Sequence, residues 1–347
     1  MYNDLKAMVQ IYNNHEILLD DEDMPSTMIK IPKFNVSDVI SGGPATVFPA
    51  FEVWKGGAWV TLDHIYISKY LNIVHNDRAY SLPFQDPANS LTIDDALEYC
   101  ENKGLGWHLM SYLEWAAIAL WCKKNSRIPH GNNNTGYDVD YATEKGILLG
   151  NYTATGSGPP TWTHNYADGI ADLNGNVAEW LSGIRLNAGE INVMEKGVPA
   201  DAGVLGHAVG SALWQSMNKT TGALQAIGAN SMHYDAANAT PAGIRLADSV
   251  TNATTDANST TENFEDIASI GSANAAGLLL LKTYGLYPDG TYDADFARLR
   301  NNGERFCARG GDYSDLAKAG VFALDFLNTR LATDAKIGFR CAWCDLS

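Results

Sequence analysis

Cysteine is the residue type in this 347-residue chain whose spacing could support metal or redox chemistry. Cys341 and Cys344 have the CxxC spacing of zinc sites and thiol redox motifs. A tetrahedral zinc site needs a second pair of ligands, and the sequence contains no second CxxC. The other cysteines (Cys100, Cys122 and Cys307) are too few for the disulfide framework of a secreted domain. We therefore expect structural or free thiols, with a redox or metal role as the alternative.

The usual catalytic motifs are missing from the sequence. It contains no P-loop and no dinucleotide-binding fingerprint. No local pattern indicates a Ser-His-Asp or Cys-His nucleophile. We expect the protein not to be an enzyme.

The region near the carboxyl end alternates between two kinds of sequence. Glycines and apolar residues form a frame at 309–311 (RGG), 319–324 (AGVFAL) and 337–340 (IGFR). The segments between them, 312–318 and 325–336, show neither an apolar period nor a matched set of polar groups. Exposed loops over a stable framework tolerate wholesale side-chain change, because surface substitutions usually cost little stability. The pattern predicts a scaffold that presents an interchangeable binding surface.

The frame residues have expected structural roles. Buried supports are predicted at Phe322, Leu324, Ile337 and Phe339. Backbone geometry that only glycine tolerates is predicted at Gly310, Gly311, Gly320 and Gly338.

Composition and charge limit the class of partner. A hydrophobic content of 46% with nine tryptophans is ample for a large core. The net charge of −16 would repel nucleic acid and anionic membranes, so we expect neither as a partner. Solubility explains this charge, and an acidic face that selects a basic ligand is the alternative. No apolar stretch approaches the roughly 18 residues of a membrane span, and no signal peptide is visible, so we expect synthesis in the cytoplasm without membrane insertion.

Local patterns predict two helices. Thr92 is a good N-cap for a helix that ends near Gly104. Ser111 and Glu114 form a capping box that begins a second helix, which runs to Cys122. The second helix is apolar nearly all round, so it should be buried.

The remaining chain is expected to form short strands and loops. Strands are predicted at 28–32 and 65–70, with a glycine-turned hairpin at 51–62. Residues 1–25 are predicted to form an arm or a subunit contact, and one domain is predicted over 26–347. Within that domain, 186–300 is predicted to be an insertion. In the insertion, 249–263 is too polar for a core, and 275–281 is a short apolar strand or helix.

Several motifs resemble those of the formylglycine-generating enzyme (sulfatase-modifying factor) superfamily, and they occur in the family's order. Residues 172–180 (DLNGNVAEW) resemble its GNVWEW signature, and 109–117 (LMSYLEWAA) resemble its LPTEAEWEYAA run. The segments 28–32, 93–100, 309–311 and 338–341 are similar to its opening strand, first helix, RGG motif and GFRC close. The resemblance covers 28–185 and 300–343. It implies an α+β, C-type-lectin-like fold of the formylglycine-generating enzyme subtype with long loop insertions.

The same resemblance suggests a structural calcium ion as the one candidate cofactor. An Asn-Gly-x-Val/Ala-x-Glu run holds calcium in that superfamily, and Asn174, Gly175, Val177 and Glu179 match it by position. Carbonyl oxygens and a carboxylate are suitable calcium ligands. In the alternative interpretation Glu179 pairs with a core arginine and Asn174 makes a turn. The family pattern also implies structural ion pairs for Arg330 and Arg340.

The catalytic groups of the superfamily are not matched. Its oxidases need a cysteine pair between the RGG and GFR motifs, and 312–337 contain no cysteine. The related sulfoxide synthases need a His-x3-His-x-Glu cluster, which the eight histidines do not form. The calcium motifs with which animal lectins bind sugars are absent too.

Residues 300–341 resemble more narrowly the variable proteins of diversity-generating retroelements, a family that includes the phage major tropism determinants. In these proteins a reverse transcriptase randomises template adenines, so that Asn codons (AAY) become NNY. NNY codons encode Asp, Tyr, Ser, Leu, Ala, Thr and Asn but not Lys, so Lys318 and Lys336 depart from the pattern. The resemblance implies a variable region over 309–340. Its predicted ligand-binding residues are Asp312, Tyr313, Ser314, Asp315, Ala317, Lys318, Asp325, Leu327, Asn328, Leu331, Ala332, Thr333, Asp334, Ala335 and Lys336.

Within this surface Tyr313 is the expected anchor, because tyrosine offers a large contact area at low entropic cost. Phe326 is expected in the core, as in the family, with an apolar surface role as the alternative.

The favoured hypothesis is a hypervariable binding protein of a phage or prophage. It would recognise a protein or glycan on a bacterial surface, as a monomer or homotrimer, from a virion or a cell surface. A structural virion or assembly protein of the same fold is the alternative. An enzyme of the formylglycine-generating type is a third hypothesis.

Overall fold

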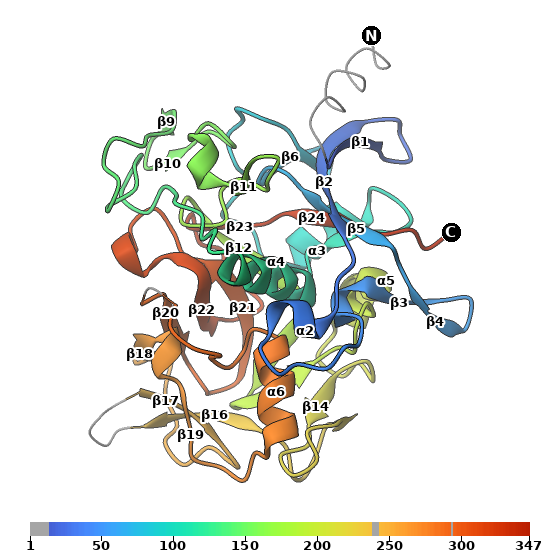
Figure 1. Ribbon diagram of the computed structural model, residues 1–347, viewed down its shortest axis with the longest axis vertical. Helices are drawn as coiled ribbons and strands as arrows, with labels where there is room; N and C mark the ends of the chain where they lie inside the picture. Colours follow the sequence, from blue (N-terminus) through green and yellow to red (C-terminus); the bar gives the residue numbers. More distant parts are fainter. Residues whose placement is uncertain (1–13, 238–242, 293) are drawn as a thin grey trace.

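A computed structural model describes residues 14–237, 243–292 and 294–347 (Figure 1). Helices and mixed sheets alternate along the chain, which confirms the predicted α+β class. Within the described residues, no helix has both the length and the apolar composition needed to cross a bilayer.

One sheet of the described chain joins both ends of the sequence. Its five strands follow the order β1-β2-β5-β24-β8, so the late strand β24 lies between two early ones. They are β1 (His15–Leu19), β2 (Pro25–Pro32), β5 (His64–Ser68), β24 (Cys341–Trp343) and β8 (Trp107–Leu109). The prediction that residues 1–25 form an arm therefore needs correction for the part of it that the structure describes. Residues 15–19 pair antiparallel with β2, because backbone hydrogen bonding to the sheet edge satisfies their polar groups. Residues 1–13 lie outside the described residues.

The larger sheet carries the carboxyl-terminal frame. Within the described residues its main path is β18-β20-β22-β21-β12-β13-β16-β17-β19, with β14, β15 and β23 attached. The strands are β12 (Ala178–Asn187), β13 (Glu190–Val193), β14 (Gln215–Met217), β15 (Leu224–Ala226), β16 (His233–Ala237), β17 (Gly243–Ala247), β18 (Thr260–Asn263), β19 (Ala268–Ser269), β20 (Phe296–Leu299), β21 (Glu304–Gly310), β22 (Gly320–Asn328) and β23 (Ile337–Gly338).

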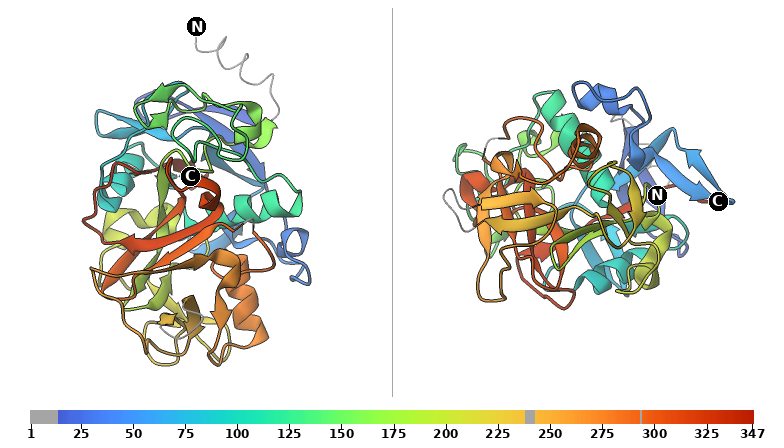
Figure 2. Two further views of the ribbon diagram at one scale, coloured as in Figure 1. Left: turned by 90° about the vertical axis from the view of Figure 1, so that its left-hand side faces the viewer. Right: turned by 90° about the horizontal axis from the view of Figure 1, so that it is seen from below.

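The predicted insertion at 186–300 therefore contributes strands to this sheet, from β13 to β20, besides its loops. Its part from β14 to α6 lies in the lower half of the molecule in Figure 1 and in the left view of Figure 2. Even the polar stretch 249–263 ends in β18, which pairs with β20. Backbone pairing along a sheet does not require apolar side chains, which is why composition failed to indicate these strands.

Both predicted helices form. α3 (Ile93–Glu101) begins at Thr92, and α4 (Tyr112–Lys124) begins at Ser111, each with a reciprocal capping box. Ten residues of α4 are buried, as its apolar sequence indicates. Other helical segments are α2 (Val36–Val39), α5 (Pro199–Gly206), α6 (Ala275–Thr283), η1 (Pro49–Phe51), η2 (Pro160–Trp162), η3 (Phe264–Asp266) and η4 (Leu316–Lys318). Smaller strands are β3 (Glu52–Lys55), β4 (Ala58–Thr61), β6 (Asn72–His75), β7 (Arg78–Ser81), β9 (Leu148–Leu149), β10 (Tyr152–Thr153) and β11 (His164–Ala167).

The cysteines do not form a CxxC site. All five are buried, and the Sγ atom of Cys341 lies 2.7 Å from that of Cys100 rather than beside Cys344. Burial raises the pKa of the Cys344 thiol. The described residues include no group of three or more His, Cys, Asp or Glu arranged to hold a metal ion.

Candidate functional site

The run at 172–180 leads into β12, and one of its residues, Glu179, forms a buried ion pair with Arg340. The Glu179 carboxylate accepts hydrogen bonds from Nε and a terminal nitrogen of Arg340, at 2.5 and 2.6 Å. Arg340 is 0% exposed and also donates to the carbonyls of Ser68 and Ala171. Both Glu179 oxygens are thus engaged, so the proposed set of Asn174, Gly175, Val177 and Glu179 does not fit a calcium ion. The core-arginine interpretation of Glu179 applies instead.

Asn176, two residues after Asn174, holds the neighbouring loops together. Its Oδ1 accepts from Nδ2 of Asn132 at 3.0 Å and from the backbone N–H of Thr153 at 2.7 Å. Its Nδ2 donates to the Thr153 carbonyl at 3.1 Å, and Asn176 is fully buried. A buried amide whose donors and acceptors are paired fixes one local geometry. This motif therefore serves as a structural junction.

The Glu179–Arg340 pair gives a first prediction. Glu179→Ala should destabilise the protein by about 3–5 kcal/mol, because it leaves a buried guanidinium without its counter-charge. Urea unfolding would measure the loss. The double variant Glu179→Leu/Arg340→Met should recover part of it. Lys33→Ala, which breaks an exposed ion pair with Asp63, is the control and should change little. A loss for Glu179→Ala no larger than for the control would contradict the prediction.

Backbone hydrogen bonds anchor the loop at 312–318. The Tyr313 N–H donates to the Asn176 carbonyl at 3.1 Å, and the Tyr313 carbonyl accepts from the Thr135 N–H at 2.8 Å. The Leu316 N–H donates to the Asn133 carbonyl at 2.9 Å. None of these three bonds involves a side chain of the loop. These three anchors are therefore independent of side-chain type, whereas within the loop the Asp315 and Asp312 carboxylates accept the N–H groups of Asp312 and Ser314.

The second segment, 331–336, meets this loop through Lys336. Its ammonium donates to the Ser314 hydroxyl at 2.5 Å, lies 3.2 Å from Oδ1 of Asp312 and sits over the Tyr313 ring. The Lys336 carbonyl accepts from the Ala178 N–H at 2.8 Å, so its backbone is also fixed to the frame. Lys336, which the codon pattern does not explain, joins the two loops.

The third segment, 325–328, lies on β22 and meets the first loop through Arg298 of β20. Arg298 is paired with Asp315 and lies 3.9 Å from Asp325. Burial raises the pKa of the Asp325 carboxyl from 3.8 to about 6, against the opposing Leu327 N–H and Arg298. Burial, followed by the nearby Asp312, also raises the pKa of Asp315. Arg298 thus holds two carboxyls from different segments at one place.

The predicted ligand-binding residues differ in exposure. The exposed ones are Ser314, Ala317, Lys318, Leu331, Thr333, Asp334 and Ala335. The half-buried ones are Tyr313, Asp315, Asp325, Leu327, Asn328, Ala332 and Lys336. Asp312 is a correction, since it is only 6% exposed and accepts hydrogen bonds from the Ser314 N–H and hydroxyl. Phe326 is 1% exposed and confirms the core interpretation, because successive strand side chains point to opposite faces.

The frame residues have the predicted roles, with one change. Phe322, Leu324, Ile337 and Phe339 are all buried. Arg330 pairs with Asp94 and Glu304. Gly310 and Gly311 have left-handed φ of +89° and +72°. Gly320 and Gly338 are needed for space instead, since a Cβ on Gly320 would lie 2.2 Å from Oδ1 of Asp295 and one on Gly338 would lie 2.6 Å from the Ala88 carbonyl.

The raised pKa of Asp325 gives a second prediction. The folded state holds this proton more tightly than the unfolded state, so the stabilising contribution is complete below about pH 3.8 and is lost as the pH rises through about 6. Asp325→Asn should therefore be more stable than the natural chain above pH 6, by up to about 3 kcal/mol. Its amide oxygen can still accept the Leu327 N–H. Denaturant unfolding of both chains at several pH values would check this, and a difference that does not change with pH would contradict it.

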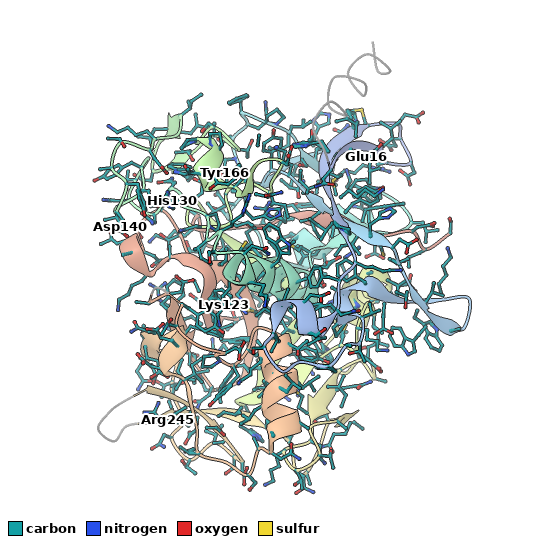
Figure 3. The ribbon with its side chains drawn as sticks, viewed as in Figure 1. Glu16, Lys123, His130, Asp140, Tyr166 and Arg245 are labelled. Atoms are coloured by element: carbon teal, nitrogen blue, oxygen red, sulfur yellow. The ribbon has the colours of Figure 1, made fainter. Side chains whose placement is uncertain are left out.

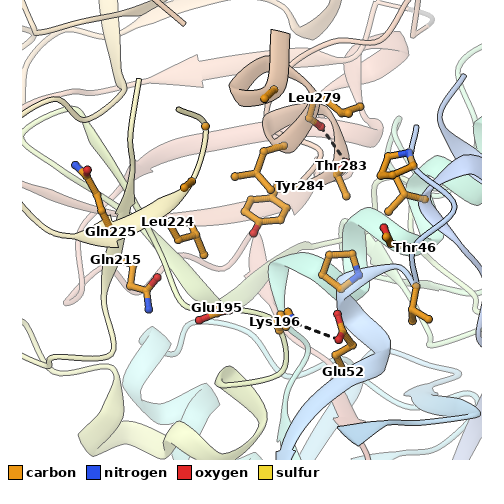
Figure 4. Close-up of a pocket in the computed structure, with 18 of the residues that line it drawn as sticks. Thr46, Glu52, Glu195, Lys196, Gln215, Leu224, Gln225, Leu279, Thr283 and Tyr284 are labelled. Atoms are coloured by element: carbon orange, nitrogen blue, oxygen red, sulfur yellow. Dashed lines mark hydrogen bonds and ion pairs between the residues drawn. The ribbon is translucent and has the colours of Figure 1, made fainter. Parts of the chain in front are cut away.

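Two cavities differ in their relation to these segments. A pocket of about 700 Å³ is lined partly by Ala317 and Ala319, together with residues that follow α4. A groove of about 1200 Å³ lies between the N-terminal region, β15 and α6, and none of the predicted variable residues lines it (Figure 4). Only the smaller pocket of these two touches the variable segments.

Sequence reasoning missed the groups that hold the site together. Arg298 lies in the supposed insertion, and its partners are apparent only from the pairing of Arg298 with Asp325 between β20 and β22. The segment 129–141 contains glycines, asparagines and one proline, which indicate turns but not contacts. Leu316, which is 46% exposed in the loop at 312–318, was also missing from the predicted set.

Comparison with known proteins shows distant structural likeness only. No family model matches the sequence, and no curated protein matches it. Among solved structures, the Major Tropism Determinant U1 Variant has a TM-score of 0.33 at 13% identity over 95% of this chain and 71% of its own. The M1 Variant has a TM-score of 0.34 at 12% identity over the same shares. PvdO from Pseudomonas aeruginosa has a TM-score of 0.30 at 13% identity over 94% of this chain and 97% of its own. Scores of this size do not establish a family, so the function must be argued from the chain's own residues.

Proposed function

We propose that this protein binds a ligand through side chains that a retroelement diversifies, on a C-type-lectin-like scaffold. The ligand would be a protein or glycan on a bacterial surface, and the protein would act in phage or prophage receptor binding from a virion or a cell surface. The observation that carries the proposal is the anchoring of 312–318 to Asn133, Thr135 and Asn176 through main-chain atoms. Such anchoring retains a loop's position while its side chains change.

The arrangement of the other two segments supports the proposal. Arg298 brings 325 to this loop, and Lys336 brings 331–336 to it. Residues from all three segments thus contribute to one connected surface, which includes the half-buried Tyr313. The same features would be of little use to a purely structural virion subunit, where a fixed surface suffices.

Natural variation provides a third prediction. Sister isolates sequenced deeply should differ at 312–318 and 325–336, whereas 319–324, 337–340 and Phe326 should stay constant. The reason is that exposed substitutions usually cost within about 0.5 kcal/mol and core substitutions cost several. A neighbouring reverse-transcriptase gene with an Asn-codon-rich copy of 305–340 should accompany this pattern. Uniform variation across frame and segments would count against diversification.

A binding experiment gives the fourth prediction. Tyr313→Ala should weaken binding of the labelled protein to its bacterial host cells about tenfold or more, because buried aromatic anchors contribute about 2 kcal/mol or more at interfaces. Its melting temperature should stay close to that of the natural chain. Trp54→Ala, which alters an exposed aromatic on the β3–β4 hairpin, is the control. Equal binding by all three proteins across a panel of strains would contradict the proposed site.

A further inference from the structure

A pocket beside the variable loop is built mostly from residues outside it. Its volume of about 700 Å³ lies within the roughly 300–1,000 Å³ of small-molecule sites. Ala317 lines it from the variable loop, whereas His130, Asp140 and Tyr141 line it from the segment after α4. Figure 3 shows His130 and Asp140 at the same edge of the molecule. The pocket thus combines a constant wall with a wall that can vary.

The constant wall carries an aromatic platform. The rings of His130 and Tyr141 stack with their centroids 3.7 Å apart and their planes 10° apart. Tyr141 remains 50% exposed, although it covers the imidazole. Glu144 fixes the imidazole by accepting from His130 Nδ1 at 2.9 Å, and it also accepts from Nε1 of Trp162 at 3.1 Å. The platform therefore has a rigid backing and an open tyrosine.

The loop that carries the platform is held in place without a ligand. Oδ1 of buried Asp138 accepts the backbone N–H groups of Asp140 at 2.9 Å and Tyr141 at 3.1 Å. Its Oδ2 accepts the Gly131 N–H at 3.0 Å. A site ordered before binding loses less conformational entropy when its ligand arrives. These contacts give the pocket a preformed shape.

The polar lining of the pocket includes the Lys123 ammonium, which donates to the Asp289 carbonyl, and the acceptors Asp140 and Asn174. Asp140 is exposed, and its carboxylate makes no hydrogen bond or ion pair with the described residues. Asn174 is 7% exposed, and its Oδ1 has no partner among them, while its Nδ2 donates to the Pro129 carbonyl at 2.9 Å. This Oδ1 is buried from solvent, so the acceptor open to a ligand is the Asp140 carboxylate. A carboxylate acceptor suits a ligand with hydroxyl donors.

We infer that this pocket binds a single residue of a neutral or amino sugar, with its C–H face on Tyr141 and its hydroxyls donating to Asp140. The negative face of an aromatic ring attracts the electropositive C–H bonds of a pyranose. Asp140 and the net charge of −16 disfavour acidic sugars, against the Lys123 ammonium in the lining. The inference deepens the proposed function and rests on it for one point, that the pocket belongs to the receptor-binding face.

The constant wall has a consequence for recognition. Residues 128–141 lie outside the diversified segments, so sugar binding should persist when 312–318 changes. The variable side chains would then select among surfaces that share a common sugar.

The test uses the full chain and free methyl glycosides of glucose, galactose, mannose and N-acetylglucosamine, with sialic acid as the anionic comparison. Ligand-observed NMR would identify binders at millimolar concentration, and titration would give each Kd. Tyr141→Ala should weaken binding about tenfold or more, and Asp140→Asn should weaken it several-fold. Tyr166→Ala, a similarly exposed tyrosine outside the pocket, should bind as the natural chain does.

Binding of a neutral or amino sugar that Tyr141→Ala abolishes supports the inference. Absence of binding by every glycoside, preference for sialic acid, or binding that Tyr141→Ala leaves unchanged overturns it. Asp140→Asn serves as the second variant, because an exposed isosteric change should not disturb folding.

The experiments can distinguish failure of the sugar pocket from failure of the proposed function. If Tyr313→Ala abolishes cell binding while Tyr141→Ala has no effect on sugar or cells, the proposed function stands without the sugar pocket. If sugar binding depends on Tyr141 while Tyr313→Ala leaves cell binding unchanged, the sugar pocket stands and the proposed function fails.

Discussion

Main-chain hydrogen bonds anchor the loop at 312–318 to its neighbours, and the rest of the site depends on this constraint. A carbonyl or N–H offers the same bond whatever side chain its residue carries, so the contacts of Tyr313 and Leu316 with Asn133, Thr135 and Asn176 do not depend on the loop's side-chain types. The residues that bond to the loop must in turn be held in position. Asn176 must be buried with its amide paired, and the Glu179–Arg340 ion pair must hold β12 near the strand that follows the second variable segment. The position of the loop at 312–318 thus depends on the buried residues directly beneath it.

Side chains and backbone groups have different roles in the described structure. Side chains such as Lys336 and Arg298 connect the segments to one another, whereas backbone groups connect them to the frame. Asp315 and Asp325 share Arg298, and burial raises the pKa of both carboxyls. The strand neighbours from 296–299 then supply the counter-charge.

Much of the frame could be predicted from sequence, because it depends on local rules. The capping residues Thr92 and Ser111 located both helices, and the spacing of glycines and apolar residues located the buried supports of β22. The strands between 190 and 299 could not be predicted, because their pairing is a long-range backbone property that polar composition conceals. The burial of Asp312 and the role of Arg298 depend on which loops meet in space. The calcium motif was a match of residue types, and it took the position of Arg340 to decide what Glu179 does.

The position of β24 links the completion of the first sheet to the end of biosynthesis. Residues 341–343 form an inner strand between β5 and β8, yet they leave the ribosome after residues 312–336. The first sheet therefore stays incomplete, with two unpaired edges, until 312–336 have emerged and taken their path. A combination of side chains that obstructs that path would leave the amino-terminal half open to proteolysis. Folding thus sets a condition on the side chains at 312–336 that is separate from any role in binding.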